Sequence, residues 1–255
     1  MDNNWDLKHL LRTLVNSATY RQSSKVTSEL LELDPKNHWL ARGPRIRLSA
    51  EMIRDQALFV SGLLSPKMFG QPVNPPQPSM GIKAAFGSSI DWETSTGEDR
   101  YRRGIYTRWR RSNPYPSMVT FDAPDRRVCT VRRSRSNTPL QALVVLNDPV
   151  YVEAAQSLAQ FLTVTKWELS DKIRLGIRQT LIRPAKDLEV QFLRELYQSA
   201  YQYYESNPKQ AYLATTNPLN PNNLENNDDI ETASLAAWVI VCNTLLNLDE
   251  MFMKR

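Results

Sequence analysis

Apolar residues recur every three or four positions along most of this chain, which is the spacing of one buried face of an α-helix. The pattern predicts helices over about 5–20, 49–64, 138–146, 149–162, 170–184 and 185–205, and a last one within 233–248. We therefore expect a mainly α protein, an irregular helical domain with few or short strands.

Each helix is expected to bury one apolar stripe and to begin at a capping residue. The expected caps are Asp2 or Asn4 for the first helix, Ser49, Thr138 before Pro139, Asp148 before Pro149, and Ser170. The expected inward residues are Leu7, Leu10, Leu11, Leu14, Val15 and Ala18 in the first helix, Met52, Ile53, Ala57, Val60 and Leu64 in the second, and Leu188, Phe192, Leu196, Ala200 and Tyr203 in 185–205.

Two stretches interrupt the helical pattern. Residues 65–99 contain five prolines and four glycines, and residues 206–229 contain seven asparagines and three prolines. Proline removes a backbone donor and restricts the residue before it, so both stretches are predicted as loops within a single domain spanning 1–255.

The composition excludes several classes of protein. No stretch approaches the ~20 consecutive apolar residues of a membrane span, and the N-terminus lacks the basic and apolar regions of a secretory signal. The two cysteines, Cys129 and Cys242, form no zinc or haem motif and are expected to be buried free thiols, with a single long-range disulfide as the alternative. With two histidines in the chain, we expect no metal and no cofactor.

The net charge of +5 is concentrated in one window. Between Arg100 and Arg135 there are eleven arginines, no lysine and two acidic residues, so this window carries +9. Guanidinium groups offer a rigid fork for carboxylate, sulfate or phosphate, and they stack on aromatic rings such as those of Tyr101, Tyr106 and Trp109.

Three interpretations of this window stay open. The arginines pair internally with Glu98, Asp99, Asp122 and Asp125, or they bind an anionic ligand such as an acidic glycan, or, less favoured, they bind nucleic acid. For the second interpretation the candidate binding residues are Arg100, Arg102, Arg103, Arg126, Arg127, Arg132, Arg133, Arg135, Asn137 and Thr138, the last two at the start of a helix whose free amides favour anions.

Three carboxylates offer a catalytic alternative. Asp122, Asp125 and Asp148 are candidates for an acid–base pair of the kind that hydrolyses glycosides. The simpler interpretation makes Asp148 a helix cap and makes Asp122 and Asp125 partners of arginines. No phosphate-binding loop or serine-hydrolase motif is present.

The central run TFDAPDRRVCTVRRSRSNTPLQALVVLNDP, residues 120–149, resembles the signature of the planctomycete secreted C-terminal domain of unknown function. Supporting matches are WDLKHL at 5–10, SATYRQS at 17–23, NHWLARGPRIRL at 37–48, GEDRYRRGIYT at 97–107 and LLNLDE at 245–250. The resemblance spans nearly the whole chain.

The resemblance implies a periplasmic or extracellular setting, whereas the N-terminus alone is typical of a cytoplasmic protein. It also implies that the chain begins inside a domain that normally ends a larger protein, after a cytochrome-c-like domain and a companion domain. The family has no established activity, so no catalytic roles carry over. The leading hypothesis is a non-catalytic interaction domain whose arginine-rich window binds an acidic polymer or a neighbouring domain; the alternative is a hydrolase or accessory protein in polysaccharide processing.

Overall fold

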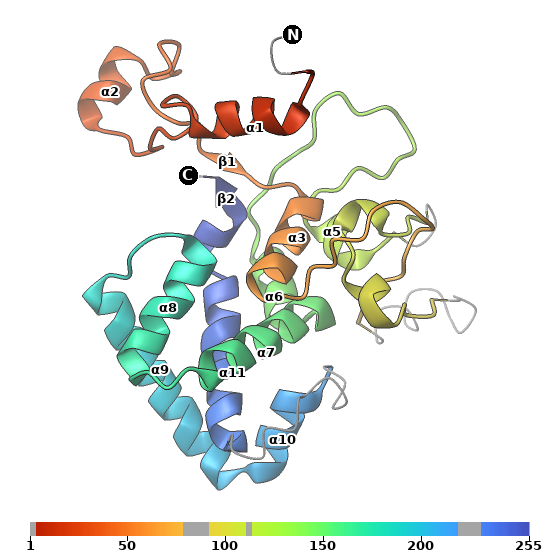
Figure 1. The fold of residues 1–255 in the computed structure, drawn as a ribbon, viewed down its shortest axis with the longest axis vertical. Helices are drawn as coiled ribbons and strands as arrows, with labels where there is room; N and C mark the ends of the chain where they lie inside the picture. Colours follow the sequence, from red (N-terminus) through yellow and green to blue (C-terminus); the bar gives the residue numbers. More distant parts are fainter. Residues whose placement is uncertain (1–3, 79–91, 111–113, 219–230, 255) are drawn as a thin grey trace. The chain divides into compact units, whose positions relative to one another are not determined.

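The computed structural model of this chain describes residues 4–78, 92–110, 114–218 and 231–254, whose path is drawn in Figure 1. Helices dominate these residues, which confirms the mainly α fold class. The chain forms two compact units: unit 1 comprises 1–48 with 252–255, and unit 2 comprises 49–251. No helix among the described residues is long and apolar enough to cross a lipid bilayer.

Unit 1 contains helices α1 (Leu7–Asn16) and α2 (Ser28–Leu33) and a short antiparallel pair of strands, β1 (Ile46–Arg47) and β2 (Met253–Lys254). A buried hydrogen-bond network follows α2, in which Arg42 donates to the carbonyl oxygens of Asp34 and Pro35 at 2.8 and 2.9 Å. The Asp34 carboxylate accepts from the backbone N–H groups of Trp39 and His38, which hold its pKa below the usual value.

Among its described residues, unit 2 contains α3 (Ala50–Val60), the 3₁₀ turns η2 (Gly97–Tyr101), η3 (Gly104–Tyr106) and η5 (Asp249–Phe252, whose last residue belongs to unit 1), and seven further helices. These helices are α5 (Pro116–Thr120), α6 (Pro139–Asn147), α7 (Pro149–Val164), α8 (Leu169–Leu181), α9 (Asp187–Ser206), α10 (Pro208–Thr216) and α11 (Thr232–Leu246).

The core of unit 2 lies between α7 and α11. Ala155, Leu158 and Leu162 on α7 and Val241 and Leu245 on α11 are completely buried, and α11 also packs against α9 and α10 (Figure 1). The apolar spacing of the sequence predicts an inward face on both helices, and nearly all of it is confirmed. On α7 and α11 the predicted residues are Val150, Val152, Ala155, Leu158, Ala159 and Leu162, and Ala233, Ala237, Trp238, Val241, Leu245 and Leu248. All are buried except Val152, which is half-buried, and Leu248, which lies at the surface beyond α11.

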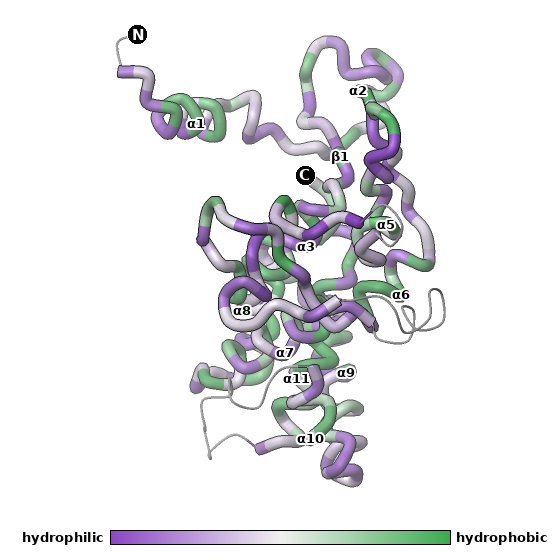
Figure 2. Tube along the Cα trace, turned by 90° about the vertical axis from the view of Figure 1, so that its right-hand side faces the viewer, coloured by the Kyte–Doolittle hydropathy of each residue, from purple (hydrophilic) through white to green (hydrophobic). Residues whose placement is uncertain are grey.

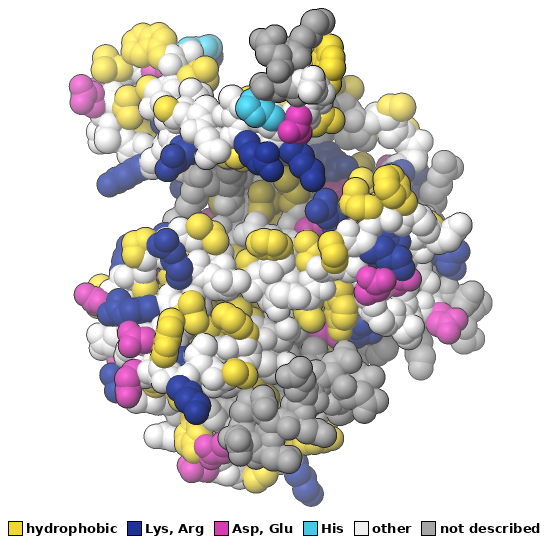
Figure 3. All heavy atoms as spheres, viewed as in Figure 1, with side chains coloured by type: hydrophobic (Ala, Val, Ile, Leu, Met, Phe, Trp, Pro, Cys, Tyr) yellow, Lys and Arg dark blue, Asp and Glu magenta, His cyan; other side chains and the backbone are white. Residues whose placement is uncertain are grey.

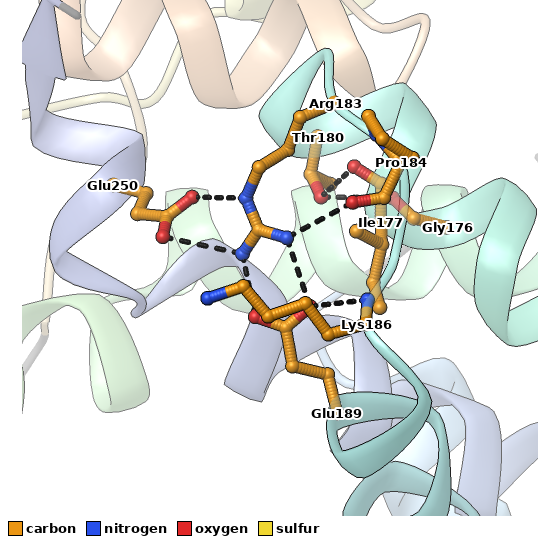
Figure 4. A network of polar contacts seen from close by, with 8 residues as sticks. All are labelled: Gly176, Ile177, Thr180, Arg183, Pro184, Lys186, Glu189 and Glu250. Carbon is orange, nitrogen blue, oxygen red and sulfur yellow. Dashed lines mark hydrogen bonds and ion pairs between the residues drawn. The ribbon is translucent and has the colours of Figure 1, made fainter. Parts of the chain in front are cut away.

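A triad of charged residues joins α8, α9 and η5 (Figure 4). Arg183 donates to Glu189 at 2.7 and 2.8 Å and to Glu250 at 2.7 and 3.2 Å. Glu189 also accepts from the backbone N–H of Lys186 at the start of α9, and together these bonds lower the pKa of Glu189 to about 2.

Several boundaries differ from those predicted. The first helix is shorter at both ends, and α3 ends at Val60 because Gly62 adopts a left-handed conformation. Helix α1 has Asp6, not Asp2 or Asn4, at its cap position, and α8 has Glu168, not Ser170. The predicted loop 206–229 is wrong over 208–216, since Pro208 occupies the first turn of α10. The predicted loop 65–99 ends in η2 and buries Val73; its residues 79–91, like 219–229 of the other loop, lie outside the described residues.

Several predicted inward residues are wrong. Met52, Leu188, Phe192 and Tyr203 are exposed. Helix α9 instead buries Val190 and Leu193, so its buried face is rotated from the predicted face by about 100°, the angle of one residue. Helix α1 buries none of its residues. Ala18 is exposed as well, just beyond the end of α1.

Candidate functional site

The first half of the arginine-rich window contains Arg100 and Arg102, which bind groups within the fold, and the second half ends in a fully exposed segment. In the first half, Arg100 forms an ion pair with Glu153 of α7, whose side chain is 2% exposed, with the Arg100 Nε atom 3.0 Å from the carboxylate. Tyr101 donates its hydroxyl to the same carboxylate at 2.8 Å, and burial together with this charge raises the pKa of Tyr101 to about 12. Arg100 therefore anchors η2 to the core.

Arg102 is buried and serves the fold as well. Its guanidinium donates to the carbonyl oxygens of Gln71 (3.1 Å) and Phe69, and it lies 3.8 Å from the centre of the Tyr106 ring. These contacts fix the start of the proline-rich segment against η3. Arg102 is thus unavailable to a ligand.

Arg54, a residue that the sequence reasoning missed, completes this arrangement. It is 1% exposed on α3 and donates to the carbonyl oxygens of Arg100 (3.1 Å) and Arg102. Its position beside Ile53 and one turn before Leu58, within an apolar face, was the signal that could have identified it.

Arg103, by contrast, is exposed next to a tight contact. The following residue, Gly104, donates its N–H to Asp55 at 2.6 Å, and a Cβ at Gly104 would lie 3.0 Å from the Glu51 Cα atom. Burial raises the pKa of Asp55 despite this hydrogen bond. Glycine is required here because the backbone of η3 approaches α3 so closely.

The second half of the window is a protruding loop, which we call the arginine arm and define as residues 125–135. All eleven residues are exposed, including Val128 and Val131, and none makes a backbone–backbone hydrogen bond with any described residue. The arm carries five arginines and one aspartate, a net charge of +4. In Figure 1 it lies within the light-green loop between α5 and α6.

The base of the arm is closed by hydrogen bonds. Asp122 accepts from the backbone N–H and the hydroxyl of Ser136 at 2.6 and 2.8 Å. Gln141 donates to Thr120 and to Ser136 from the first turn of α6. The pairing of Asp122 with arginine is therefore a wrong prediction, since its described partner is a serine that closes the loop.

The arm arginines differ in how far they are engaged. Arg133 donates to Glu51 at 2.7 and 3.0 Å. Partial burial acts to raise the pKa of Glu51, but the hydrogen bonds and the charge of Arg133 contribute to a net lowering of this pKa. Arg127 lies 3.9 Å from Asp125, and Arg126 lies 5.1 Å from the centre of the Trp109 ring. Arg132 and Arg135 make no ion pair or hydrogen bond with the described residues.

The prediction that the arginines pair with Glu98 and Asp99 is wrong, because Lys67 binds both carboxylates.

Asn137 and Thr138 follow the arm at the start of α6 and are exposed. Thr138 occupies the cap position but makes no side-chain capping bond, and Pro139 supplies the first turn. In Figure 3 the lysine and arginine side chains are scattered over the face shown rather than gathered in one patch. The structure thus brings together the arm residues and the start of α6, whereas Arg102 is buried and Arg100 is half-buried in its ion pair with Glu153.

The three candidate carboxylates lie in different environments. Asp125 is exposed on the arm, Asp122 closes its base, and Asp148 is 2% exposed. Asp148 accepts from the Val150 N–H at 3.0 Å, which confirms it as the cap of α7. Burial raises the pKa of Asp148 to about 6, against the opposing effects of this hydrogen bond and of the Arg54 charge.

Metal-ligating groups, pockets and cysteines among the described residues do not add a second candidate site. No group of three or more metal-ligating side chains is present there. An open pocket of about 590 Å³ lies along α8, lined by Trp167, Glu168, Asp171, Arg174, Leu175 and Arg178, and it contains none of the predicted site residues. Both cysteines are free, so the disulfide alternative is wrong, and Cys129 is exposed on the arm rather than buried.

Comparisons with known proteins place the chain in a family but match no characterised protein. No curated protein and no solved structure matches the chain. A family model described as "PSD1: Protein of unknown function (DUF1553)" matches residues 1–197 of the 255. The chain therefore belongs to this family of proteins of unknown function.

Proposed function

We propose that this protein is a binding module whose arginine arm engages an acidic polymer. The observation that carries the proposal is the run of eleven exposed residues at 125–135, with five arginines of which Arg132 and Arg135 have no described carboxylate partner. Uncompensated guanidinium groups on a loop are suited to bidentate contacts with sulfate, phosphate or carboxylate groups.

The form of the arm supports the same function. Its base is fixed by Asp122 and Ser136, so the loop is held in place although its tip makes few contacts. Compact surface loops whose ends lie close together are frequently functional. Arg126 stacked near Trp109 adds an aromatic surface beside the cations.

An extracytoplasmic setting is part of the proposal. It rests on the resemblance of residues 120–149 to planctomycete secreted C-terminal domains. In that setting acidic polysaccharides are the expected class of polymer, and an acidic surface of a neighbouring domain is the alternative that the test must separate.

The test is a binding titration of the purified protein against heparin (sulfated), hyaluronan (carboxylated) and dextran (neutral) at rising salt. The arm variant replaces Arg126, Arg127, Arg132 and Arg135 with Gln and spares Arg133, which pairs with Glu51. The control variant removes four exposed cations elsewhere on unit 2 through Lys166→Gln, Arg178→Gln, Arg194→Gln and Lys209→Gln.

Salt-sensitive binding to the acidic polymers is expected, with at least a tenfold loss of affinity in the arm variant and less than a threefold loss in the control variant. Equal losses in both variants would mean that only net charge matters. Absence of binding by the folded wild-type protein would reject the acidic polymer and leave the neighbouring domain.

A hydrolase remains the second candidate, and one observation favours it. The Asp148 pKa of about 6 lies in the range of a general acid. Its side chain is only 2% exposed, so catalysis would require the carboxyl to become accessible. Release of reducing sugar from acidic polysaccharides that is abolished by Asp148→Asn, in a protein that stays folded, would establish it.

A further inference from the structure

Helix α1 of unit 1 presents an apolar face without a partner in the described chain. The periodicity of Leu7, Leu10, Leu11, Leu14 and Val15 predicts burial, yet these side chains are between 44% and 72% exposed. Trp5, just before the helix, is 78% exposed. In Figure 2 the tube of α1 alternates between hydrophobic and hydrophilic residues along its turns. Such a face requires an occupant, since exposed apolar surface of this size marks an interaction site.

The geometry of the helix indicates the chemistry of that occupant. At about 100° per residue, the five apolar side chains cover an arc of about 140°, which is broader than the narrow seam of a coiled coil. Lys8 and Arg12 lie one turn apart, immediately beside the Val15 edge of this arc. Long basic side chains at such an edge can bury their stems in apolar surroundings and keep their charges at a polar boundary.

The charge of α1 is one-sided. The sequence LKHLLRTLVN contains two basic residues, one histidine and no acidic residue. Along the sequence, the nearest described acidic residue is the cap, Asp6, whose carboxylate accepts from the Lys8 N–H at 2.8 Å. The polar side of the helix is therefore complementary to a negatively charged surface.

We propose that α1 binds the surface of an anionic lipid bilayer, lying in the plane of the interface with its leucines among the acyl chains. Trp5 sits at the headgroup level, where aromatic rings are favoured, and Lys8 and Arg12 contact lipid phosphates. A helix of ten residues is marginal in water, so the interface also stabilises its helical form. This interaction is separate from the arginine arm, which belongs to unit 2.

The experiment measures binding of the full chain to vesicles of phosphatidylcholine alone and of phosphatidylcholine with phosphatidylglycerol at about 7:3. The face variant carries Leu10→Ser, Leu11→Ser and Leu14→Ser, and the edge variant carries Lys8→Gln and Arg12→Gln. The arm variant described above is the control, because its cations are also attracted to anionic lipid. All substituted side chains are exposed, and circular dichroism verifies that each variant is folded.

The wild-type chain is expected to bind the anionic vesicles, and the face variant to lose at least tenfold in partition coefficient. The edge variant loses the preference for anionic over neutral vesicles, and the arm variant keeps most of its binding. Brominated lipids quench part of the tryptophan fluorescence, and this part disappears in Trp5→Phe. These results would hold even if the arm bound no polymer.

Other outcomes overturn the proposal. If the face variant binds as the wild type does and the arm variant does not bind, the arm alone attracts the vesicles. If no variant binds vesicles, but sedimentation shows a dimer that the face variant abolishes, a second copy of the chain covers α1. Absence of both behaviours rejects lipid as the occupant of this face.

Discussion

Arg54, Arg100 and Arg102 show how far composition alone can mislead about individual arginines. The absence of lysine from the window predicts that guanidinium geometry matters, and this is true of Arg102, which contacts two carbonyl oxygens and an aromatic ring together. The sequence could not show which arginines turn inward, because the partners are backbone carbonyls and Glu153, far away along the chain. Long-range pairing of this kind leaves no local periodic signal.

Arg54→Met tests the structural role of the buried arginines. The substitution leaves the carbonyl oxygens of Arg100 and Arg102 without their donor in a buried place, so the free energy of unfolding should fall by about 3 kcal/mol. Arg178→Met, at an exposed position on α8, should change it by no more than about 0.5 kcal/mol. Urea denaturation of both variants makes the comparison, and equal effects would contradict the assigned role.

Asp148 supplies a prediction about pH. Its pKa is about 6 in the folded protein against 3.8 for the ordinary carboxyl, so the folded state holds a proton that the unfolded state releases between these values. Its contribution to stability therefore falls as pH rises from about 4 to 6, by about 3 kcal/mol in all. Asp148→Asn keeps an oxygen for the Val150 N–H and has no charge to bury. The variant should exceed the wild type in unfolding free energy by about 1–3 kcal/mol at pH 7, with little difference at pH 4; an unchanged difference across this range would contradict the prediction.

At the scale of elements, the positions of the helices were predictable and their faces only partly so. Proline after Thr138 and Asp148 correctly marked the starts of α6 and α7. On α9 the apolar and aromatic residues surround much of the helix, so sequence alone could not choose between the row with Leu188 and Phe192 and the row with Val190 and Leu193. Contact with α11 makes that choice.

The Arg183 triad at the junction of α8, α9 and η5 gives an element-scale prediction. Arg183→Gln removes charge-assisted bonds to Glu189 and Glu250, and we expect a loss of about 1–2 kcal/mol, reduced by solvent screening because the three side chains are 21–30% exposed. Because the pKa of Glu189 is lowered from 4.5 to about 2, its ionised carboxylate stabilises the folded protein fully above pH 4.5. This contribution is lost as the pH falls towards 2. The effect of the substitution should therefore be smaller at pH 3 than at pH 7 in thermal unfolding. A pH-independent effect would mean that packing, rather than charge, links these elements.

At the scale of the whole molecule, the chain separates a well-packed helical unit from a small unit rich in exposed apolar residues. Helices α7 and α11 of unit 2 bury nine of sixteen and ten of fifteen residues, whereas α1 and α2 of unit 1 contain no buried residue. An amphipathic pattern predicts which face of a helix is apolar, but it does not reveal whether the chain itself provides the covering surface. For the same reason, the charge of the arginine-rich window was visible in the sequence, but which of its arginines pack into the fold was not.

Backbone hydrogen exchange with and without a heparin-derived oligosaccharide tests the arginine arm most directly. In the free protein, the amides of residues 125–135 should exchange within seconds, because they lack backbone hydrogen bonds to the described chain. On addition of the oligosaccharide, exchange should slow in this segment and at the start of α6, while the core helices remain unchanged. Slow exchange of the arm in the free protein, or protection that appears elsewhere and not in the arm, would contradict the account.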